Sequence, residues 1–188
     1  YMTAKEEDIL TSQNLIKKGV VIDQLLKSLI ISKVSLDELL IGDKNAIMLA
    51  ARILGYGKTY ATDTTCTHCG AVEKECEYDL TLFEHKPIDE SQFKGENKFE
   101  FKLPNSGRVI EYKFMTHKDE QDAAIEVDRM KKAMGGRTQE VTTRLRKQIV
   151  SVDGNEDKEF INNFINNEFF AMDSRAYREH YSESQPDI

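Results

Sequence analysis

The segment Gly55-Tyr56-Gly57 separates two kinds of hydrophobic pattern in this chain. Before it, apolar residues recur at spacings of three and four, which predicts amphipathic helices. After it, residues 58–115 contain short runs of β-forming residues separated by turn sequences. Helical spacing returns at residue 116 and continues toward the end of the chain. This order predicts an α+β fold, with a mainly helical body and a small antiparallel strand insertion.

We therefore expect three parts: an N-terminal helical part at 1–57, a strand-rich insertion at 58–115, and a C-terminal helical part at 116–188 that packs with the first. A chain of 188 residues is long enough for one sizeable domain that carries an insertion. The first residue is Tyr1 rather than Met, so we expect the sequence to be a segment of a longer chain.

Local signals define the expected helices before the insertion. Thr3 and Glu6 have the spacing of a capping box, and this helix should run to Lys18 and end at Gly19. A second helix is predicted from about residue 20 to 30. Two more are predicted to start at caps Ser35 and Asp43 and to end at Gly42 and at Gly55-Tyr56-Gly57.

Two hairpins are expected in the insertion. Strands at 58–65 and 71–80 flank the turn Cys66-Thr67-His68-Cys69-Gly70, and Val72 and Tyr78 are the expected packing residues of the second strand. Strands at 98–103 and 108–115 flank the turn at 104–107. The C-terminal part should hold helices at 118–134 and 138–150, separated by Gly135-Gly136, a turn at 153–155, and a last helix from 158 to about 181.

Charge and composition narrow the class of partner. The chain has 33 Asp and Glu against 26 Lys and Arg, a net charge of −7, and an acidic surface repels the phosphates of nucleic acid. It contains no apolar run near the roughly 20 residues that a membrane span requires. Three cysteines, an odd number, argue against a disulfide framework and for a reducing compartment. We predict protein partners, with neither a membrane nor nucleic acid among them.

The sequence Cys66-x-x-Cys69-Gly70 between two strands has the shape of a zinc knuckle. Cys76 and His85 would complete a set of four ligands for a structural zinc ion. The spacing predicts a zinc-ribbon-like hairpin, and the interpretation we favour is that it keeps this shape without binding metal through these residues alone. Bound zinc is the alternative. A redox role requires a helix start after the first cysteine, and a thiol protease requires a paired histidine. Neither signature is present, so we predict that the chain is not an enzyme.

Aromatic residues at helical spacing mark a second site. Phe160, Phe164 and Phe169 recur on one face, and pairs of asparagines fall on the other. This face either packs into the core or binds a partner. Arg175 and Arg178 follow on the same predicted helix and extend the hypothetical partner-binding site. Asp173 beside them is expected to orient a neighbouring strand or to bind with the arginines to a partner.

The order of several segments resembles a known family. These segments are Leu36 to Asp43 (LDELLIGD), Ala51 to Gly57 (ARILGYG), Cys66-Thr-His-Cys69-Gly70, Tyr78-Asp79-Leu80, Leu103 to Gly107, Met115-Thr116 and Asp173-Ser174-Arg175. Together they resemble the baseplate hub proteins of contractile-tailed, T-even-type bacteriophages, over residues 2–188.

The resemblance implies a non-enzymatic protein that helps to assemble the hub of the phage tail baseplate, either as a hub subunit or as an assembly chaperone. Its partners would be baseplate hub or tape-measure proteins, and self-association is a further hypothesis. It would act in the host cytoplasm during assembly and would remain in the virion if it is a subunit. Two alternatives are a zinc-ribbon adaptor in transcription or replication, which predicts bound zinc, and a thiol-dependent enzyme that uses Cys66, which predicts selective alkylation of one cysteine.

Overall fold

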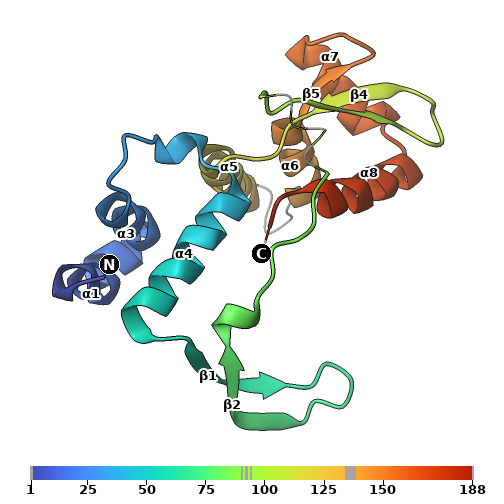
Figure 1. Cartoon of the computed structure of the whole chain (residues 1–188). Helices are drawn as coiled ribbons and strands as arrows, with labels where there is room; N and C mark the ends of the chain where they lie inside the picture. The colour runs from blue at the N-terminus through green and yellow to red at the C-terminus, as the bar shows by residue number, and fades with distance from the viewer. Residues whose placement is uncertain (1, 90, 92, 94, 134–138, 188) are drawn as a thin grey trace. The chain divides into compact units, whose positions relative to one another are not determined.

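The computed structural model describes residues 2–89, 91, 93, 95–133 and 139–187. The chain forms two compact units. The first contains Tyr1–Leu36, Gly42–Lys86 and Asp187–Ile188, and the second contains Asp37–Ile41 and Pro87–Pro186. The expected strand-rich segment at 58–115 is shared between them, because its first hairpin belongs to the first unit and its second hairpin to the second. Figure 1 shows the elements of each unit. The fold class is α+β, as predicted.

The first unit consists of short helices and one hairpin. The helices are α1 (Ala4–Thr11), α2 (Gln13–Lys18), α3 (Val21–Leu29) and most of α4 (Ile41–Tyr56). The predicted capping box at Thr3 and Glu6 is confirmed, and Gly19 ends α2 with a left-handed φ of 69°. The helix expected from Thr3 to Lys18 is broken at Ser12, whose backbone is extended.

The start of α4 differs from the prediction. The helix begins at Ile41, so Gly42 and Asp43 lie in its first turn instead of ending one helix and capping the next. Asp43 is favourable there because its charge complements the helix dipole. Before α4, residues Leu36–Glu38 form only one 3₁₀ turn, η1.

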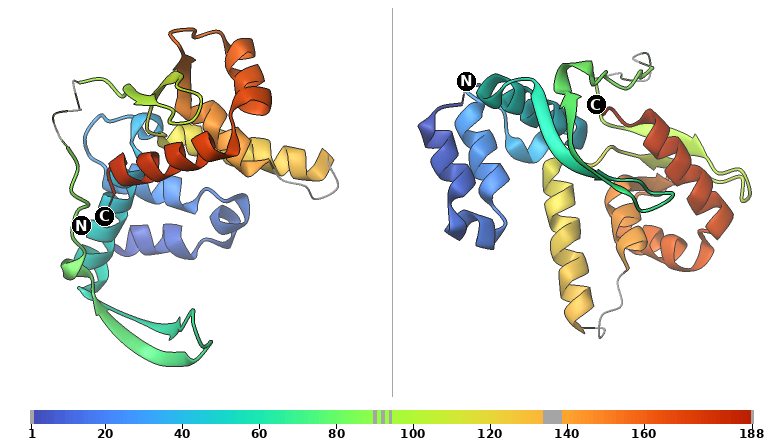
Figure 2. Two further views of the ribbon diagram at one scale, coloured as in Figure 1. Left: turned by 90° about the vertical axis from the view of Figure 1, so that its right-hand side faces the viewer. Right: turned by 90° about the horizontal axis from the view of Figure 1, so that it is seen from below.

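The hairpin of β1 (Thr59–Thr65) and β2 (Val72–Asp79) leads away from the end of α4, as Figure 1 and the left view of Figure 2 show. Its residues are exposed or half-buried along both strands. The expectation that Val72 and Tyr78 pack was wrong, because they are 57% and 41% exposed. The Tyr78 hydroxyl instead shares a hydrogen bond of 2.8 Å with the Thr64 hydroxyl. A further 3₁₀ turn, η2 (Leu80–Leu82), follows the hairpin.

The second unit is built on an antiparallel sheet with the order β3-β4-β5. Its strands are β3 (Phe99–Lys102), β4 (Val109–Tyr112) and β5 (Ile149–Val152). The helices are α5 (His117–Ala133), α6 (Glu140–Gln148), α7 (Lys158–Asn163) and α8 (Ala171–Ser184). Phe99, Leu103, Ile110, Tyr112, Phe114, Leu145, Ile149, Val152, Ile161, Phe164, Ile165, Tyr177 and Tyr181 form its buried core.

Strand β5 corrects the helix predicted at 138–150. Helix α6 ends at Gln148, and Ile149 is already extended. The β-branched residues of β5 suit a pleated surface, and pairing with β4 satisfies their backbone groups. The proposed break at Gly135-Gly136 lies outside the described residues.

The last predicted helix also consists of several pieces. Helix α7 passes into a π-helical turn, η4 (Phe164–Glu168), and α8 starts only at Ala171. Phe169 and Phe170 are extended between them. Because of this break, the two side chains lie in different environments: Phe169 is half-buried and Phe170 is exposed.

Candidate functional site

The first candidate site is the turn between β1 and β2. The amide of Cys66 donates to the carbonyl of Ala71 at 2.8 Å, and the amide of Gly70 donates to the carbonyl of Cys66 at 2.9 Å. Gly70 has a φ of 71°, a left-handed conformation that suits glycine. These bonds fold the turn so that Cys66 and Cys69 lie close together, and both are exposed.

Hydrogen bonds around Cys66 favour its thiolate. Backbone groups of Cys69 and His68, followed by the side chain of Cys69, hydrogen-bond to the sulfur and lower the pKa of the Cys66 thiol. A negatively charged sulfur is stabilised when it accepts such bonds. The turn therefore holds two sulfurs side by side, and the hydrogen bonds make Cys66 ionise more readily than an ordinary cysteine.

The other two predicted ligands are not gathered at this turn. Cys76 lies in β2 opposite Thr62, and its thiol donates to the carbonyl of Glu73 at 3.7 Å. His85 follows the 3₁₀ turn η2. Within the described residues, no three His, Cys, Asp or Glu side chains are grouped so that they could hold a metal ion. The structure thus brings together Cys66 and Cys69, and the four-ligand set of Cys66, Cys69, Cys76 and His85 stays a prediction.

The aromatic residues predicted to bind a partner pack largely against the core of the second unit. Phe164 is 1% exposed and stacks on Phe169 with 5.2 Å between ring centroids. Phe160 and Phe169 are half-buried against the same core. The guanidinium of Arg108 lies over the Phe164 ring, 5.3 Å from its centroid. These contacts favour the core alternative for Phe164, while partner binding through Phe160 and Phe169 stays a prediction.

Helix α8 presents exposed side chains that the sequence pattern missed. Met172 is 72% exposed and Phe170, directly before the helix, is 56% exposed. The predicted Arg175 and Arg178 are also exposed. Arg175 pairs with Glu179 at 2.9 Å, and Arg178 donates to the carbonyl of Ser174 at 3.2 Å. Phe170 adjoins the predicted aromatic face, and only the break before α8 reveals that it points to solvent.

A shallow cavity of about 230 Å³ lies beside this helix, between α6 and α8. Its lining combines apolar and charged groups: Glu140, Val141, Arg144, Leu145, Gln148 and Arg178. Val141 is 46% exposed, whereas Leu145 is buried below it. Arg144 already pairs with Glu120 and Glu140 at 3.9 and 3.6 Å, so Arg178 is the group of this cavity that would meet a partner carboxylate.

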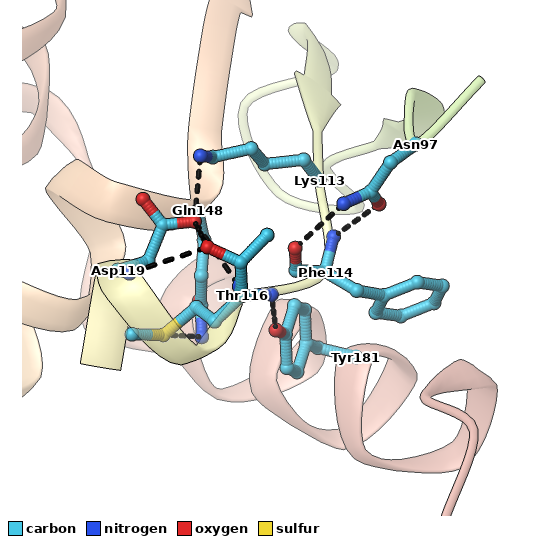
Figure 3. Close-up of polar contacts among 8 residues, drawn as sticks. Asn97, Lys113, Phe114, Thr116, Asp119, Gln148 and Tyr181 are labelled. Atoms are coloured by element: carbon cyan, nitrogen blue, oxygen red, sulfur yellow. Dashed lines mark hydrogen bonds and ion pairs between the residues drawn. The ribbon is translucent and has the colours of Figure 1, made fainter. Parts of the chain in front are cut away.

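A polar network fixes the passage from β4 into α5 (Figure 3). The side-chain amide of Asn97 donates to the carbonyl of Phe114 and accepts from its amide, both at 2.8 Å. The amide of Lys113 donates to the carbonyl of Gln148 at 2.8 Å. Thr116 and Asp119 bond to each other as a helix cap, and the ammonium of Lys113 lies 2.7 Å from the Asp119 carboxylate.

A segment from earlier in the chain, residues 37–41, pairs with the start of α5. Leu40 forms a bridge with Thr116, and the amide of His117 donates to the carbonyl of Leu39 at 2.8 Å. This pairing explains why residues 37–41 belong to the second unit.

A larger cavity of about 570 Å³ lies next to this network, and most of its charged lining residues take part in ion pairs. Lys113 pairs with Asp119, and Arg146 and Lys147 both pair with Glu126, at 3.4 and 3.8 Å. Paired charges of both signs do not make a site for a free anion. We therefore regard this cavity as a structural ion-pair cluster.

The exposed aromatic, methionine and arginine side chains of the second unit are of types enriched in protein interfaces. None of the helices in the described ranges is long and apolar enough to cross a bilayer.

The sequence matches the family described as T4 bacteriophage base plate protein over residues 1–167, and the chain belongs to that family. The resemblance to phage baseplate proteins inferred from the sequence is thereby confirmed. Comparisons with curated proteins and with solved structures gave no match. The matched segment includes the cysteine turn and ends before α8. A baseplate family favours a non-enzymatic role and a place in the virion tail.

Proposed function

We propose that this baseplate protein builds the hub of the baseplate by binding other baseplate proteins, as a hub subunit or an assembly chaperone. The observation that carries the proposal is the family match over residues 1–167. The exposed apolar side chains of the described residues support it, because such side chains are the usual anchors of protein interfaces.

We assign the binding surface of the second unit to the start of α8 and the neighbouring residue of α6. This α8 face consists of Phe170, Met172, Arg175, Arg178 and Val141. Its aromatic, methionine and arginine side chains are types enriched in interfaces. Phe160 and Phe169 are half-buried against the core of the same unit.

The charges of the α8 face predict the chemistry of its partner. Arg175 is 78% exposed and is paired with the 60% exposed Glu179. Such an exposed pair contributes little to stability, so Arg175 can exchange Glu179 for a partner carboxylate at small cost. The expected partner surface therefore combines apolar groups with Asp or Glu, and it belongs to a hub or tape-measure protein.

A co-expression pull-down tests the binding surface. The full chain carries an affinity tag and is expressed with the baseplate proteins of its own phage. Met172→Ser combined with Arg178→Glu should reduce the recovered partner at least tenfold. Ile125→Ser is the matched control, because Ile125 is an apolar residue of α5 with 51% exposure. Equal recovery with the wild-type chain and the double variant would refute the assigned surface.

A second measurement separates the two roles. Quantitative mass spectrometry compares the amount of the chain in purified tails with its amount in the lysate of infected cells. A fixed number of copies per tail identifies a hub subunit. A chaperone is abundant in the host cytoplasm during assembly and absent from tails. If removing the gene leaves baseplate assembly intact, the proposed function is wrong.

A further inference from the structure

We propose that Cys66 and Cys69 form one half of a zinc site, and that the same two cysteines of a second copy of this chain complete it. The site would join two hairpins tip to tip through one ion with four thiolate ligands. This inference is independent of the α8 face and of its partner.

The turn already holds the two sulfurs next to each other. Cys66 and Cys69 lie close enough for their side chains to hydrogen-bond, and backbone groups of His68 and Cys69 bond to the Cys66 sulfur. The Cys66–Ala71 and Gly70–Cys66 backbone bonds fix the turn at its base. Little rearrangement is needed before the two sulfurs bind one ion.

Two cysteines supply only half of the ligands of a structural zinc site. A structural zinc ion takes four protein ligands in a tetrahedron. In the part of the chain that the structure describes, no third His, Cys, Asp or Glu joins this pair to make a metal-binding group. Both thiols are exposed in the turn between β1 and β2, where another molecule can reach them.

A second copy is the occupant that matches these ligands best. Thiolates are preferred zinc ligands, and a two-fold axis through the ion would place two pairs of them around it. A bound ion would also stabilise the hairpin, which has little packing of its own. Its strands are exposed on both faces, and an isolated two-stranded hairpin is marginally stable in water. Zinc binding would stabilise the folded turn, because metal binding is coupled to folding.

The chemistry of site formation balances without electron transfer. Each chain gives up two thiol protons to the buffer, and four Zn–S bonds form to one Zn²⁺ ion. Zinc remains in the +2 state, and the cysteines remain reduced.

The charge of the hairpin makes a further prediction. Between Thr59 and Asp79 the hairpin carries more carboxylates than ammonium groups. The carboxylates are those of Asp63, Glu73, Glu75, Glu77 and Asp79, and the ammonium group is that of Lys74. Two such tips repel each other, and a zinc ion with four thiolates adds negative charge. Salt screens this repulsion, with a screening length of about 10 Å at 0.1 M. The zinc-linked dimer should therefore strengthen as NaCl is raised from 50 to 500 mM, whereas zinc-dependent binding to a basic protein would weaken.

The test uses the full chain, reduced with a phosphine, and ZnCl₂ alone. Sedimentation velocity and metal analysis are run on the same samples. The expected result is one zinc per two chains and a rise from the 21.6 kDa monomer to twice that mass. A chelator should reverse the change. Co²⁺ in place of zinc should give the intense sulfur-to-metal absorption of a four-thiolate site.

Single substitutions identify the ligands. Cys66→Ser and Cys69→Ser should each abolish the zinc-dependent dimer, while Cys76→Ser, the matched control, should keep it. Far-UV circular dichroism checks that the helices are intact in each variant. One zinc per monomer, lost in Cys76→Ser or His85→Ala, would overturn the proposal in favour of a site within one chain. A wild-type chain that binds no zinc, or binds it without dimerising, would also overturn it. None of these results depends on the pull-down.

Discussion

The amide of Met115 donates a hydrogen bond to the phenol oxygen of Tyr181, with 2.9 Å between nitrogen and oxygen. The two residues are 66 positions apart in the sequence. The bond therefore joins the segment that leads into α5 to helix α8. Both residues are buried, and this burial raises the pKa of Tyr181 to about 12. Water is therefore poorly placed to replace the phenol oxygen in this hydrogen bond, which Figure 3 draws as a dashed line.

Tyr181→Phe should leave the Met115 amide buried without its acceptor. The expected cost is about 1–3 kcal/mol of unfolding free energy, the penalty for an unpaired buried donor. Urea unfolding at pH 7, followed by circular dichroism, measures this loss. Tyr60→Phe is the control, because Tyr60 is 44% exposed in the hairpin. Equal midpoints for the two variants would mean that another group satisfies the amide.

Helix ends were predictable where neighbouring residues alone determine them. Thr3 and Glu6 cap α1 through bonds between residues three apart, and Gly19 ends α2 through its own left-handed conformation. Strand β5 was missed because its conformation depends on pairing with β4, about 40 residues earlier. A short run of apolar residues such as Ile149–Val152 suits either a helix end or a strand until its partner is known.

In the candidate sites, too, the local contacts could be predicted from the sequence and the long-range placement of residues could not. The pairing of Cys66 with Cys69 is local, since a turn of a few residues brings them together. The placement of Cys76 and His85 depends on the course of β2 and η2, which spacing alone does not give. Burial of Phe164 and exposure of Met172 depend on the chain break at Phe169 and Phe170, and the helical period predicted a continuous helix there.

Glu6 should make the folding stability of the first unit decrease at acidic pH. Hydrogen bonds from the side chain of Ser28, and then from Thr3, lower its pKa to about 2 from an ordinary value of 4.5. Because the folded pKa is the lower one, the stabilisation is complete above about pH 4.5 and is lost as the pH falls toward 2. NMR titration of the Glu6 carboxyl carbon measures the folded pKa directly.

Ser28→Ala should raise the Glu6 pKa toward its ordinary value, because it removes the largest cause of the shift. Glu6→Gln should reduce the difference in melting temperature between pH 5.5 and pH 3. Asp8→Asn is the matched control, since Asp8 is exposed on the same helix. An unchanged Glu6 titration in Ser28→Ala would show that this contact is absent in solution.

Asp173 fixes the turn between β3 and β4. Its carboxylate is 0% exposed and accepts from the amides of Asn105 at 2.7 Å and Ser106 at 3.1 Å. Asp173→Ala should lower the unfolding free energy by about 2–3 kcal/mol, because it removes hydrogen bonds to a charged acceptor and leaves two amides unpaired. Urea unfolding measures the change, with the exposed Asp122→Ala as control. A loss no larger than that of the control would show that the turn is satisfied by other contacts.

Phe164 and Met172 should separate stability from partner binding. Phe164 is 1% exposed and Met172 is 72% exposed, although both lie in the segment predicted as one continuous helix. Phe164→Ala should cost about 3–5 kcal/mol, because it removes a buried ring and leaves a cavity. Met172→Ala should change the unfolding free energy by less than about 0.5 kcal/mol, because the residue is exposed.

Urea unfolding of each variant tests these two stability predictions, and the pull-down is repeated at a temperature where both variants remain folded. Partner recovery should fall for Met172→Ala and stay unchanged for Phe164→Ala. The reverse pattern, with a stable Phe164→Ala chain that loses its partner, would mean that Phe164 leaves the core on binding and itself forms the contact.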